Sequence, residues 1–200
     1  MSGKEIEQPL SMSPEDIEPG RIKFFGVCHI VFGSLGLMNV AYGIVMQFLR
    51  EPLFRVTQTG GPDRIQEIQN VMYRDLAVSN WINIGMSLVV GILILRAGIA
   101  LTKRRQSSVR LSNAYALSSL IAKAIGILVF LLLTLPVIGG ALTAMLAESN
   151  GALPGWTERL RVLIGAIGVG GFLLSTIYPL CTFVMLNKDN VQQHLAKHGT

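Results

Sequence analysis

Residues 76–101 read LAVSNWINIGMSLVVGILILRAGIAL, and Arg96 is the only charged side chain among them. As a straight α-helix this run would be about 39 Å long at 1.5 Å per residue, whereas the hydrocarbon core of a bilayer is about 30 Å thick. An α-helix satisfies its own backbone hydrogen bonds, as lipid requires. The run therefore predicts a membrane-spanning helix, with Arg96 close enough to its end for the side chain to reach the headgroups.

Three other apolar runs predict three further spans, at about 24–49, 117–146 and 160–186. Hydrophobic residues make up 50% of the chain and charged residues only 14%, while in soluble domains about a quarter of the residues are charged. All twelve acidic residues fall outside the predicted spans. We therefore predict an all-α polytopic membrane protein, a left-handed four-transmembrane-helix bundle over residues 21–187.

The segments outside the spans are short and polar. Residues 1–20 contain three prolines and predict a disordered tail. Pro52 predicts the end of the first span, because proline cannot continue the helical hydrogen bonds. Residues 63–75 carry apolar side chains at helical spacing, which predicts an amphipathic helix that runs into the second span. Residues 188–200 predict a short helical tail.

The third apolar run is longer than a span needs to be. Residues 111–147 contain no acidic side chain and would form about 55 Å of straight helix. We expect the surplus at the start of the run, as an amphipathic lead-in. Pro136, followed by Gly139 and Gly140, predicts a kink or a loosened final turn.

The distribution of lysine and arginine predicts the orientation. With the N-terminus in the cytosol, ten of these residues lie on the inner side and six on the outer side, with Lys123 left aside. The compact cluster Lys103-Arg104-Arg105 decides the balance, so both termini are expected in the cytosol. Because the basic residues gather at the ends of spans and not along one face, we expect contact with membrane lipids and no binding of nucleic acid.

One face of the first span is built mainly of small residues. Its members follow one another at spacings of three and four, and they are Gly26, His29, Gly33, Gly36, Val40 and Gly43. Small residues let a second helix approach closely, which is how helices pack in lipid. The face therefore predicts packing within this chain or an interface with a second copy or another membrane protein. His29 is expected to be a hydrogen-bonded packing residue.

Lys123 is the one charge well inside the third span. A charge within lipid costs a few kcal/mol or more, so such a residue is a candidate functional group. If the span starts near Leu120, the amine lies only about 5 Å inside and reaches water. The other interpretation is a site for an anionic lipid or substrate, shared with Arg96 and Arg110. A further candidate is Asn39, near the middle of the first span, which with other asparagines is expected to form interhelical hydrogen bonds.

The sequence contains no pattern typical of catalysis. No nucleotide-binding or hydrolase motif occurs, and the acidic residues form no pair within the spans. The three histidines and two cysteines form no cluster with the spacing of a metal site. We therefore predict no catalytic residue, no metal and no cofactor.

Two segments resemble known proteins. Gly26-Val-Cys-His-Ile-Val-Phe-Gly33 looks like the opening of uncharacterised bacterial four-transmembrane-helix (tetraspan) membrane proteins and, more faintly, of the membrane-spanning four-domain subfamily A group. Tyr178-Pro179, followed by Leu186-Asn187-Lys188, also resembles the bacterial set. The resemblance implies a multi-pass protein of a bacterial inner (plasma) membrane, and it carries over no activity and no site residues.

Three functions are compatible with these features. The first is a non-enzymatic accessory, scaffold or sensor component that acts through helix contacts. The second is an oligomeric pore or small transporter, in which the small-residue face of the first span and Asn39 line the path. The third is binding of an anionic lipid by Lys123, Arg96 and Arg110.

Overall fold

The computed structural model describes residues 14–57, 64–148 and 155–198 of the chain. Every element over these residues is a helix, which confirms the predicted all-α class. The elements are α1 (Pro14–Thr57), α2 (Arg64–Asp75), α3 (Ala77–Thr102), α4 (Ser108–Val129), the π-helical turn η1 (Phe130–Thr134), α5 (Leu135–Glu148), α6 (Trp156–Leu186) and α7 (Asp189–His198).

Four helical stretches are long and apolar enough to cross a membrane. They are Gly20–Arg50, Ala77–Thr102, Ser108–Glu148 and Trp156–Leu186. Their surface is largely apolar: the outward side chains of Met38 and Leu132, for example, are 69% and 71% exposed. Large apolar side chains facing outward suit hydrocarbon and not water. The structure thus confirms a four-span membrane protein.

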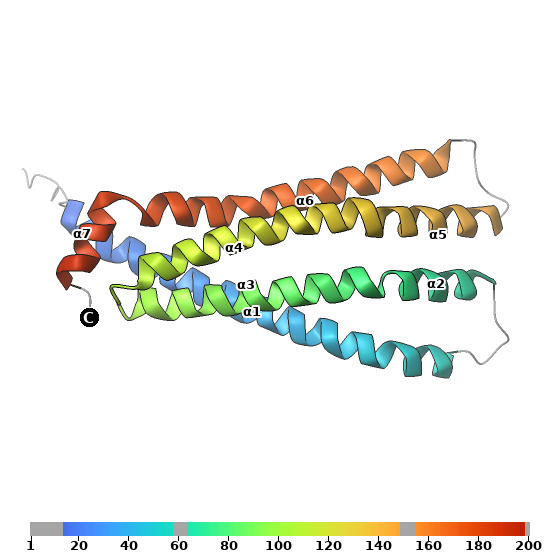
Figure 1. Cartoon of the computed structure of the whole chain (residues 1–200), viewed down its shortest axis with the longest axis horizontal. Coiled ribbons are helices and arrows are strands. Elements are labelled where there is room, and N and C mark those ends of the chain that lie inside the picture. Colours follow the sequence, from blue (N-terminus) through green and yellow to red (C-terminus); the bar gives the residue numbers. More distant parts are fainter. Residues whose placement is uncertain (1–13, 58–63, 149–154, 199–200) are drawn as a thin grey trace, which may run out of the picture.

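The four spans lie side by side and all run along the long axis of the molecule (Figure 1). In space α3 packs between α1 and α4, α4 packs against α6, and α2 packs against α5. One end carries the start of α1, the connection at 103–107 and α7, and we call it the basic end. The other end carries the end of α1, α2, α5 and the start of α6, and we call it the loop end. Between the two ends, α1 swings away from α6 toward the loop end (Figure 1).

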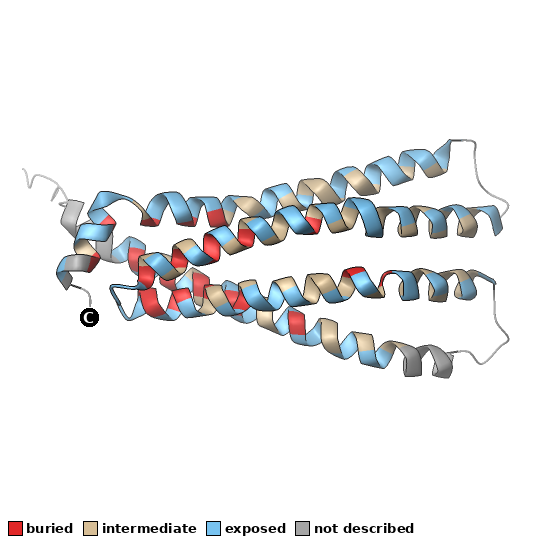
Figure 2. Ribbon diagram, in the orientation of Figure 1, coloured by how far each residue is buried: buried red, intermediate tan, exposed pale blue. Residues whose placement is uncertain are grey.

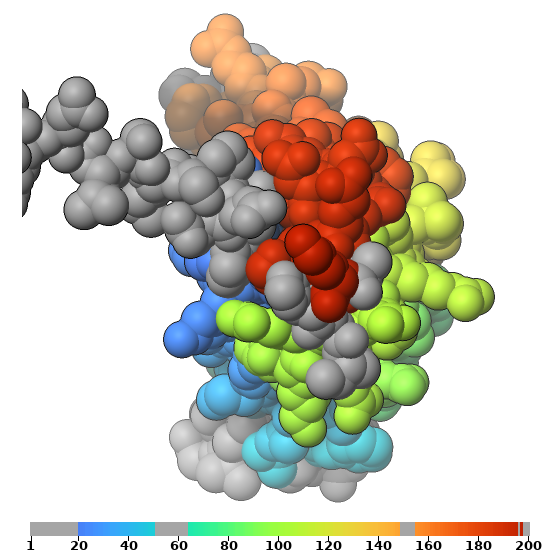
Figure 3. Space-filling model, turned by 90° about the vertical axis from the view of Figure 1, so that its left-hand side faces the viewer, coloured from blue at the N-terminus to red at the C-terminus, as the bar shows by residue number. Residues whose placement is uncertain are grey.

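The compact core lies at the basic end, where Figure 2 shows most of the buried residues. Apolar side chains from α1, α3, α6 and α7 form this core cluster: Ile22, Leu101, Leu186, Val191 and Leu195. Figure 3 looks onto this end and shows α7 lying across it. The amphipathic α7 therefore closes the basic end.

The first helix extends beyond both predicted boundaries. The expected disordered tail 1–20 is wrong for residues 14–20, which are the first turns of α1, while residues 1–13 lie outside the described residues. A proline is well tolerated in a first helical turn, where its missing N–H has no partner to lose. At the other end α1 passes through Pro52 and continues to Thr57, so the predicted stop was also wrong. A proline keeps a helical φ and removes one hydrogen bond, and the helix tolerates that loss here.

The third span is helical from Ser108 to Glu148, but its hydrogen-bond pattern changes at η1 (Phe130–Thr134). Pro136 has no N–H for the carbonyl four residues before it, and its ring crowds that carbonyl. The wider turn lets the N–H of Leu135 donate to the carbonyl of Phe130 instead. Pro136 then stands in the first turn of α5, where no donor is required. The predicted interruption therefore takes the form of a π turn just before the proline.

The other boundaries lie close to the expected ones. The second span, predicted at 76–101, is α3 (Ala77–Thr102), and α2 leads into it through Leu76 alone. The fourth span, predicted at 160–186, starts four residues earlier at Trp156. The tail predicted at 188–200 contains α7.

Candidate ligand-binding site

Glycines bring α1 and α3 into backbone contact near the basic end. A Cβ atom added to Gly98 of α3 would lie 2.8 Å from the Cβ of His29 and 2.8 Å from the backbone nitrogen of Ile30. A Cβ added to Gly33 would lie 3.1 Å from the Cα of Leu95. No side chain fits at these distances, so each helix uses its glycines to pack against the other.

The small-residue face of α1 divides into two parts. Gly26 and Val40 are buried, and a Cβ on Gly26 would lie 3.2 Å from the backbone nitrogen of Thr102. A Cβ on Gly43 would touch only the side chain of Ile84, at 3.4 Å. Gly36 differs from the others, since a Cβ there would meet nothing within 4 Å. Most of the face therefore packs within the chain, while Gly36 borders open space.

His29 is the point where all four spans meet. Its side chain is fully buried, and its Nδ1 lies 2.7 Å from the hydroxyl oxygen of Tyr178 on α6 in a hydrogen bond. Its ring centroid lies 5.2 Å from that of Tyr115 on α4, and its Cβ borders Gly98 on α3. The two segments that carry the sequence resemblance, which contain His29 and Tyr178, thus meet in space. We call these contacts the histidine junction (His29, Tyr178, Tyr115 and Gly98).

The Tyr178→Phe variant tests the histidine junction. Loss of the hydroxyl leaves the buried Nδ1 of His29 without this partner, and we expect a cost of about 1–2 kcal/mol in the free energy of unfolding. The measurement is unfolding of the purified protein in mixed micelles, followed by circular dichroism. Tyr42→Phe is the matched control, because the Tyr42 side chain is exposed and should cost nothing measurable. Equal stability of the two variants would contradict the proposed hydrogen bond.

Beyond the histidine junction, on the side of the loop end, lies a central cavity of about 320 Å³. All four spans line it: α1 with Phe32 and Gly36, α3 with Asn83, Met86, Ser87, Val90, Gly91 and Ile94, α4 with Tyr115, Ser119, Ala122, Lys123 and Gly126, and α6 with Phe172 and Ser175. Its wall combines apolar and aromatic surface with a few polar groups, as in many ligand sites.

Lys123 is the one charged side chain in the wall of the central cavity. Its Nζ donates a hydrogen bond of 3.1 Å to the Oγ of Ser119, one helical turn before it. Gly36, Val90 and Phe172, which share the cavity with it, stand at or next to the midpoints of their own candidate spans. Lys123 therefore shares the cavity with residues from the middle of the other three candidate spans, and it stands five residues before the midpoint of its own, Ser108–Glu148.

Arg96 and Arg110 do not join Lys123. Both side chains are exposed, and neither lines the central cavity. Arg110 stands thirteen residues before Lys123 on the same helix, which separates them by about 20 Å along the axis. The predicted three-residue anion site is therefore not formed, and Lys123 supplies the charge of the cavity alone.

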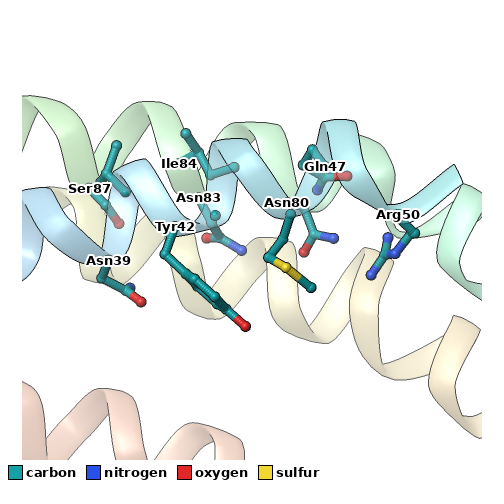
Figure 4. Close-up of a pocket in the computed structure, with 11 residues that line it drawn as sticks. Asn39, Tyr42, Gln47, Arg50, Asn80, Asn83, Ile84 and Ser87 are labelled. Atoms are coloured by element: carbon teal, nitrogen blue, oxygen red, sulfur yellow. The ribbon is translucent and has the colours of Figure 1, made fainter. Parts of the chain in front are cut away.

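A polar groove of about 310 Å³ runs between α1 and α3 toward the loop end. Figure 4 shows its polar side chains following one another along the groove: Asn39, Tyr42, Gln47, Arg50, Asn80, Asn83 and Ser87. Asn83 and Ser87 also line the central cavity, so the two spaces share part of their walls. Asn39, predicted with Lys123 as a possible lipid or ligand contact, lines this groove, while Lys123 lines the central cavity.

The expected interhelical hydrogen bonds of the asparagines are not formed. Among the described residues, the side chains of Asn39, Asn80 and Asn83 hydrogen-bond to no other protein group. The reason is geometric: α1 and α3 touch at their glycines, and the longer amides stand beside this contact and face the groove. The carboxamides are therefore available to a ligand.

The central cavity is closed on the side of the basic end. Tyr115 is both a wall residue of the cavity and a member of the histidine junction. Behind this junction the core cluster fills the space between α1, α3, α6 and α7. Asn83 and Ser87, which also line the polar groove, border the cavity on the side away from this junction.

Comparison of the chain with protein-family models, with curated proteins and with solved structures found no match. The arrangement of the central cavity, the polar groove and the histidine junction is therefore the basis on which a function is assigned.

Proposed function

We propose that this protein is a non-enzymatic membrane component that binds an anionic lipid, or an amphiphile of the same chemistry, in its central cavity. The observation that carries the proposal is Lys123, the one charged side chain in a cavity lined by all four candidate membrane spans. Binding of this kind suits a sensor or accessory subunit, whose helix contacts depend on what the cavity holds.

The charge of Lys123 requires a partner from outside the chain. No aspartate or glutamate occurs in residues 76–147 or 159–188, nor between residues 19 and 50. A charge in the middle of a bilayer is costly unless it is paired or hydrated. The ammonium group has three N–H donors, and Ser119 accepts one of them. Two donors are thus left for a phosphate or carboxylate.

The wall of the central cavity favours an amphiphile over a small inorganic anion. Part of this wall is apolar and is formed by Phe32, Met86, Ile94 and Phe172. A bare phosphate would leave this apolar surface uncovered, whereas a hydrocarbon chain would cover it. Polar residues stand among these side chains and can hydrogen-bond to a headgroup: Asn83, Ser87, Tyr115, Ser119 and Ser175.

We further propose that the basic end faces the cytosol of a bacterial inner membrane. The connection at 103–107 brings Lys103, Arg104 and Arg105 together at this end, where α7 also lies. Retention of clustered lysine and arginine in the cytosol supports this orientation. The central cavity would then open toward the outer leaflet.

The test is the amount of anionic lipid that stays bound to the purified protein, measured by native mass spectrometry after equilibration with phosphatidylglycerol. We expect Lys123→Ala to lower the apparent affinity roughly tenfold, the usual effect of removing one charged hydrogen-bond partner. Lys103→Ala, which removes an exposed charge at the basic end, should leave the affinity unchanged. Equal lipid retention by wild type and Lys123→Ala would refute the proposal.

A second candidate function is a small transporter. It is favoured by the surroundings of the central cavity, which borders the histidine junction toward the basic end and shares Asn83 and Ser87 with the polar groove toward the loop end. An unequal arrangement of this kind is what alternating access requires of one state. Purified protein in liposomes should then accumulate or release an anionic amphiphile in a Lys123-dependent manner. Absence of any flux or conductance would exclude both this function and the pore.

A further inference from the structure

The polar groove holds a set of hydrogen-bonding groups without partners. Asn39, Asn80 and Asn83 each present a carboxamide, with two N–H donors and one acceptor oxygen, and none of them bonds to another described residue. Polar groups left unpaired in hydrocarbon are unfavourable, so natural proteins give them a partner. The groove therefore requires a polar occupant.

The groove runs along the loop-end part of the first candidate span. Along α1 its wall extends from Arg50, the last residue of the first candidate span, to Asn39. The eleven steps from residue 39 to residue 50 cover about 16 Å of helix, a length equal to about half of the hydrocarbon core. At the inner end the groove shares Asn83 and Ser87 with the central cavity. The groove and the cavity that holds Lys123 are thus neighbours that share two wall residues.

The charges along this route are all positive. Arg50 stands at the outer end, where its guanidinium carbon lies 3.9 Å from the ring centroid of Tyr73. Lys123 stands in the central cavity at the inner end, and no acidic residue lines either space. An arginine held over an aromatic ring still offers N–H donors to an oxyanion. The occupant is therefore an anionic group with several hydrogen-bond acceptors, such as a phosphodiester.

The surroundings identify the source of that group as lipid. Asn39 and Tyr42 are exposed on the flank of α1, and their neighbours Met38 and Val45 are exposed apolar side chains. A polar strip open to the side and bordered by hydrocarbon-facing residues lets a headgroup enter while its acyl chains stay in the bilayer. We propose that the polar groove holds the headgroup of an anionic glycerophospholipid from the loop-end leaflet and delivers it to Lys123. Only the delivery step rests on the proposed function.

Photo-crosslinking of the wild-type protein in liposomes tests this site directly. Two phosphatidylglycerol probes are compared, one with the photoreactive group in the headgroup and one with it at the end of an acyl chain. We expect the headgroup probe to label the groove peptides around residues 39–47 and 80–87, and the acyl probe to label apolar flanks. Headgroup labelling confined to the loop-end surface, or acyl labelling inside the groove, would overturn the proposal.

A double variant, Asn39→Leu with Asn80→Leu, checks that the carboxamides are responsible. Leucine has the branching and the number of side-chain heavy atoms of asparagine but no hydrogen-bonding group, so we expect headgroup labelling of the groove to fall roughly fivefold or more. Met38→Leu with Val78→Leu is the matched control, since both residues are exposed and line no part of the groove. Unchanged labelling in a folded double asparagine variant would overturn the assignment.

Three further experiments distinguish this proposal from the alternative explanations. If Lys123→Ala keeps the groove labelling while bound lipid is unchanged, the groove site stands and the function proposed for the central cavity fails. If excess glycerol phosphate in the buffer abolishes the labelling, the groove binds a water-soluble anion and the lipid assignment is wrong. If cysteines introduced at Asn39 crosslink two copies of the chain, the groove is an oligomer interface and the proposal is wrong.

Discussion

Replacing Gly98 by leucine is expected to prevent the spans from assembling at the basic end. The first added carbon would lie 2.8 Å from the Cβ of His29 and 2.8 Å from the backbone nitrogen of Ile30. A backbone cannot yield as a flexible side chain can, so α1 and α3 must separate and the histidine junction opens. Overpacking typically costs 1–3 kcal/mol and more where the backbone must shift. We therefore expect a loss of about 3 kcal/mol or more in the free energy of unfolding.

The measurement for Gly98 is unfolding in mixed micelles together with the yield of monodisperse protein. Gly98→Ala adds only the clashing carbon and provides a milder variant if the leucine protein does not fold. Gly85→Leu is the matched control on the same helix, because Gly85 is exposed and has nothing within 4 Å of an added Cβ. A Gly98→Leu protein as stable as Gly85→Leu would show that α1 and α3 do not pack as described.

Replacing Gly36 by leucine is expected to abolish lipid binding without unfolding the protein. Gly36 lines the central cavity, and an added Cβ meets no atom within 4 Å. The leucine side chain would therefore occupy ligand space at the level of Lys123. Forcing a ligand past such a side chain costs about 1–3 kcal/mol or more, which corresponds to a drop in affinity of roughly tenfold to a hundredfold.

Retained phosphatidylglycerol in native mass spectrometry is the readout for Gly36, with the unfolding transition measured in parallel. Gly85→Leu again serves as the control, and it should retain lipid as the wild type does. The same variant separates two functions, because a scaffold acting through Gly36 would lose a co-purifying partner instead of lipid. Full lipid retention by a folded Gly36→Leu protein would refute the central cavity as the binding site.

The positions of the spans could be predicted from the sequence because each span obeys a local rule. A run of apolar residues long enough to cross 30 Å of hydrocarbon has to be a helix, whatever it packs against. The second span was placed within one residue of α3 (Ala77–Thr102) on this basis. The rule fails at the margins, where Pro14, Pro19 and Pro52 lie inside α1, because a proline removes one hydrogen bond but keeps a helical φ, so it does not always end a helix.

The candidate site could be predicted only in its parts. Lys123 and Asn39 were recognisable because charges and amides in a span are rare. That the two residues line neighbouring spaces was not predictable, since they belong to different helices. The groove lined by Asn39 and the cavity lined by Lys123 share only the wall residues Asn83 and Ser87. Tyr178 entered only through the resemblance and Tyr115 not at all, because a tyrosine in a span is ordinary until a buried histidine is placed beside it.

By itself the sequence determined that the chain is an all-α membrane protein with four crossings, because hydrophobicity over the length of a helix is a property of consecutive residues. The tertiary structure alone decided the place of Lys123 in a cavity lined by all four spans, the unpaired state of the asparagines and the meeting of His29 with Tyr178. These depend on how one helix slides and turns against another, which is set by close contacts such as that of Gly98 with His29. Contacts between residues far apart in the chain follow from the shapes of the packed helix surfaces, and residue spacing along the sequence does not predict them.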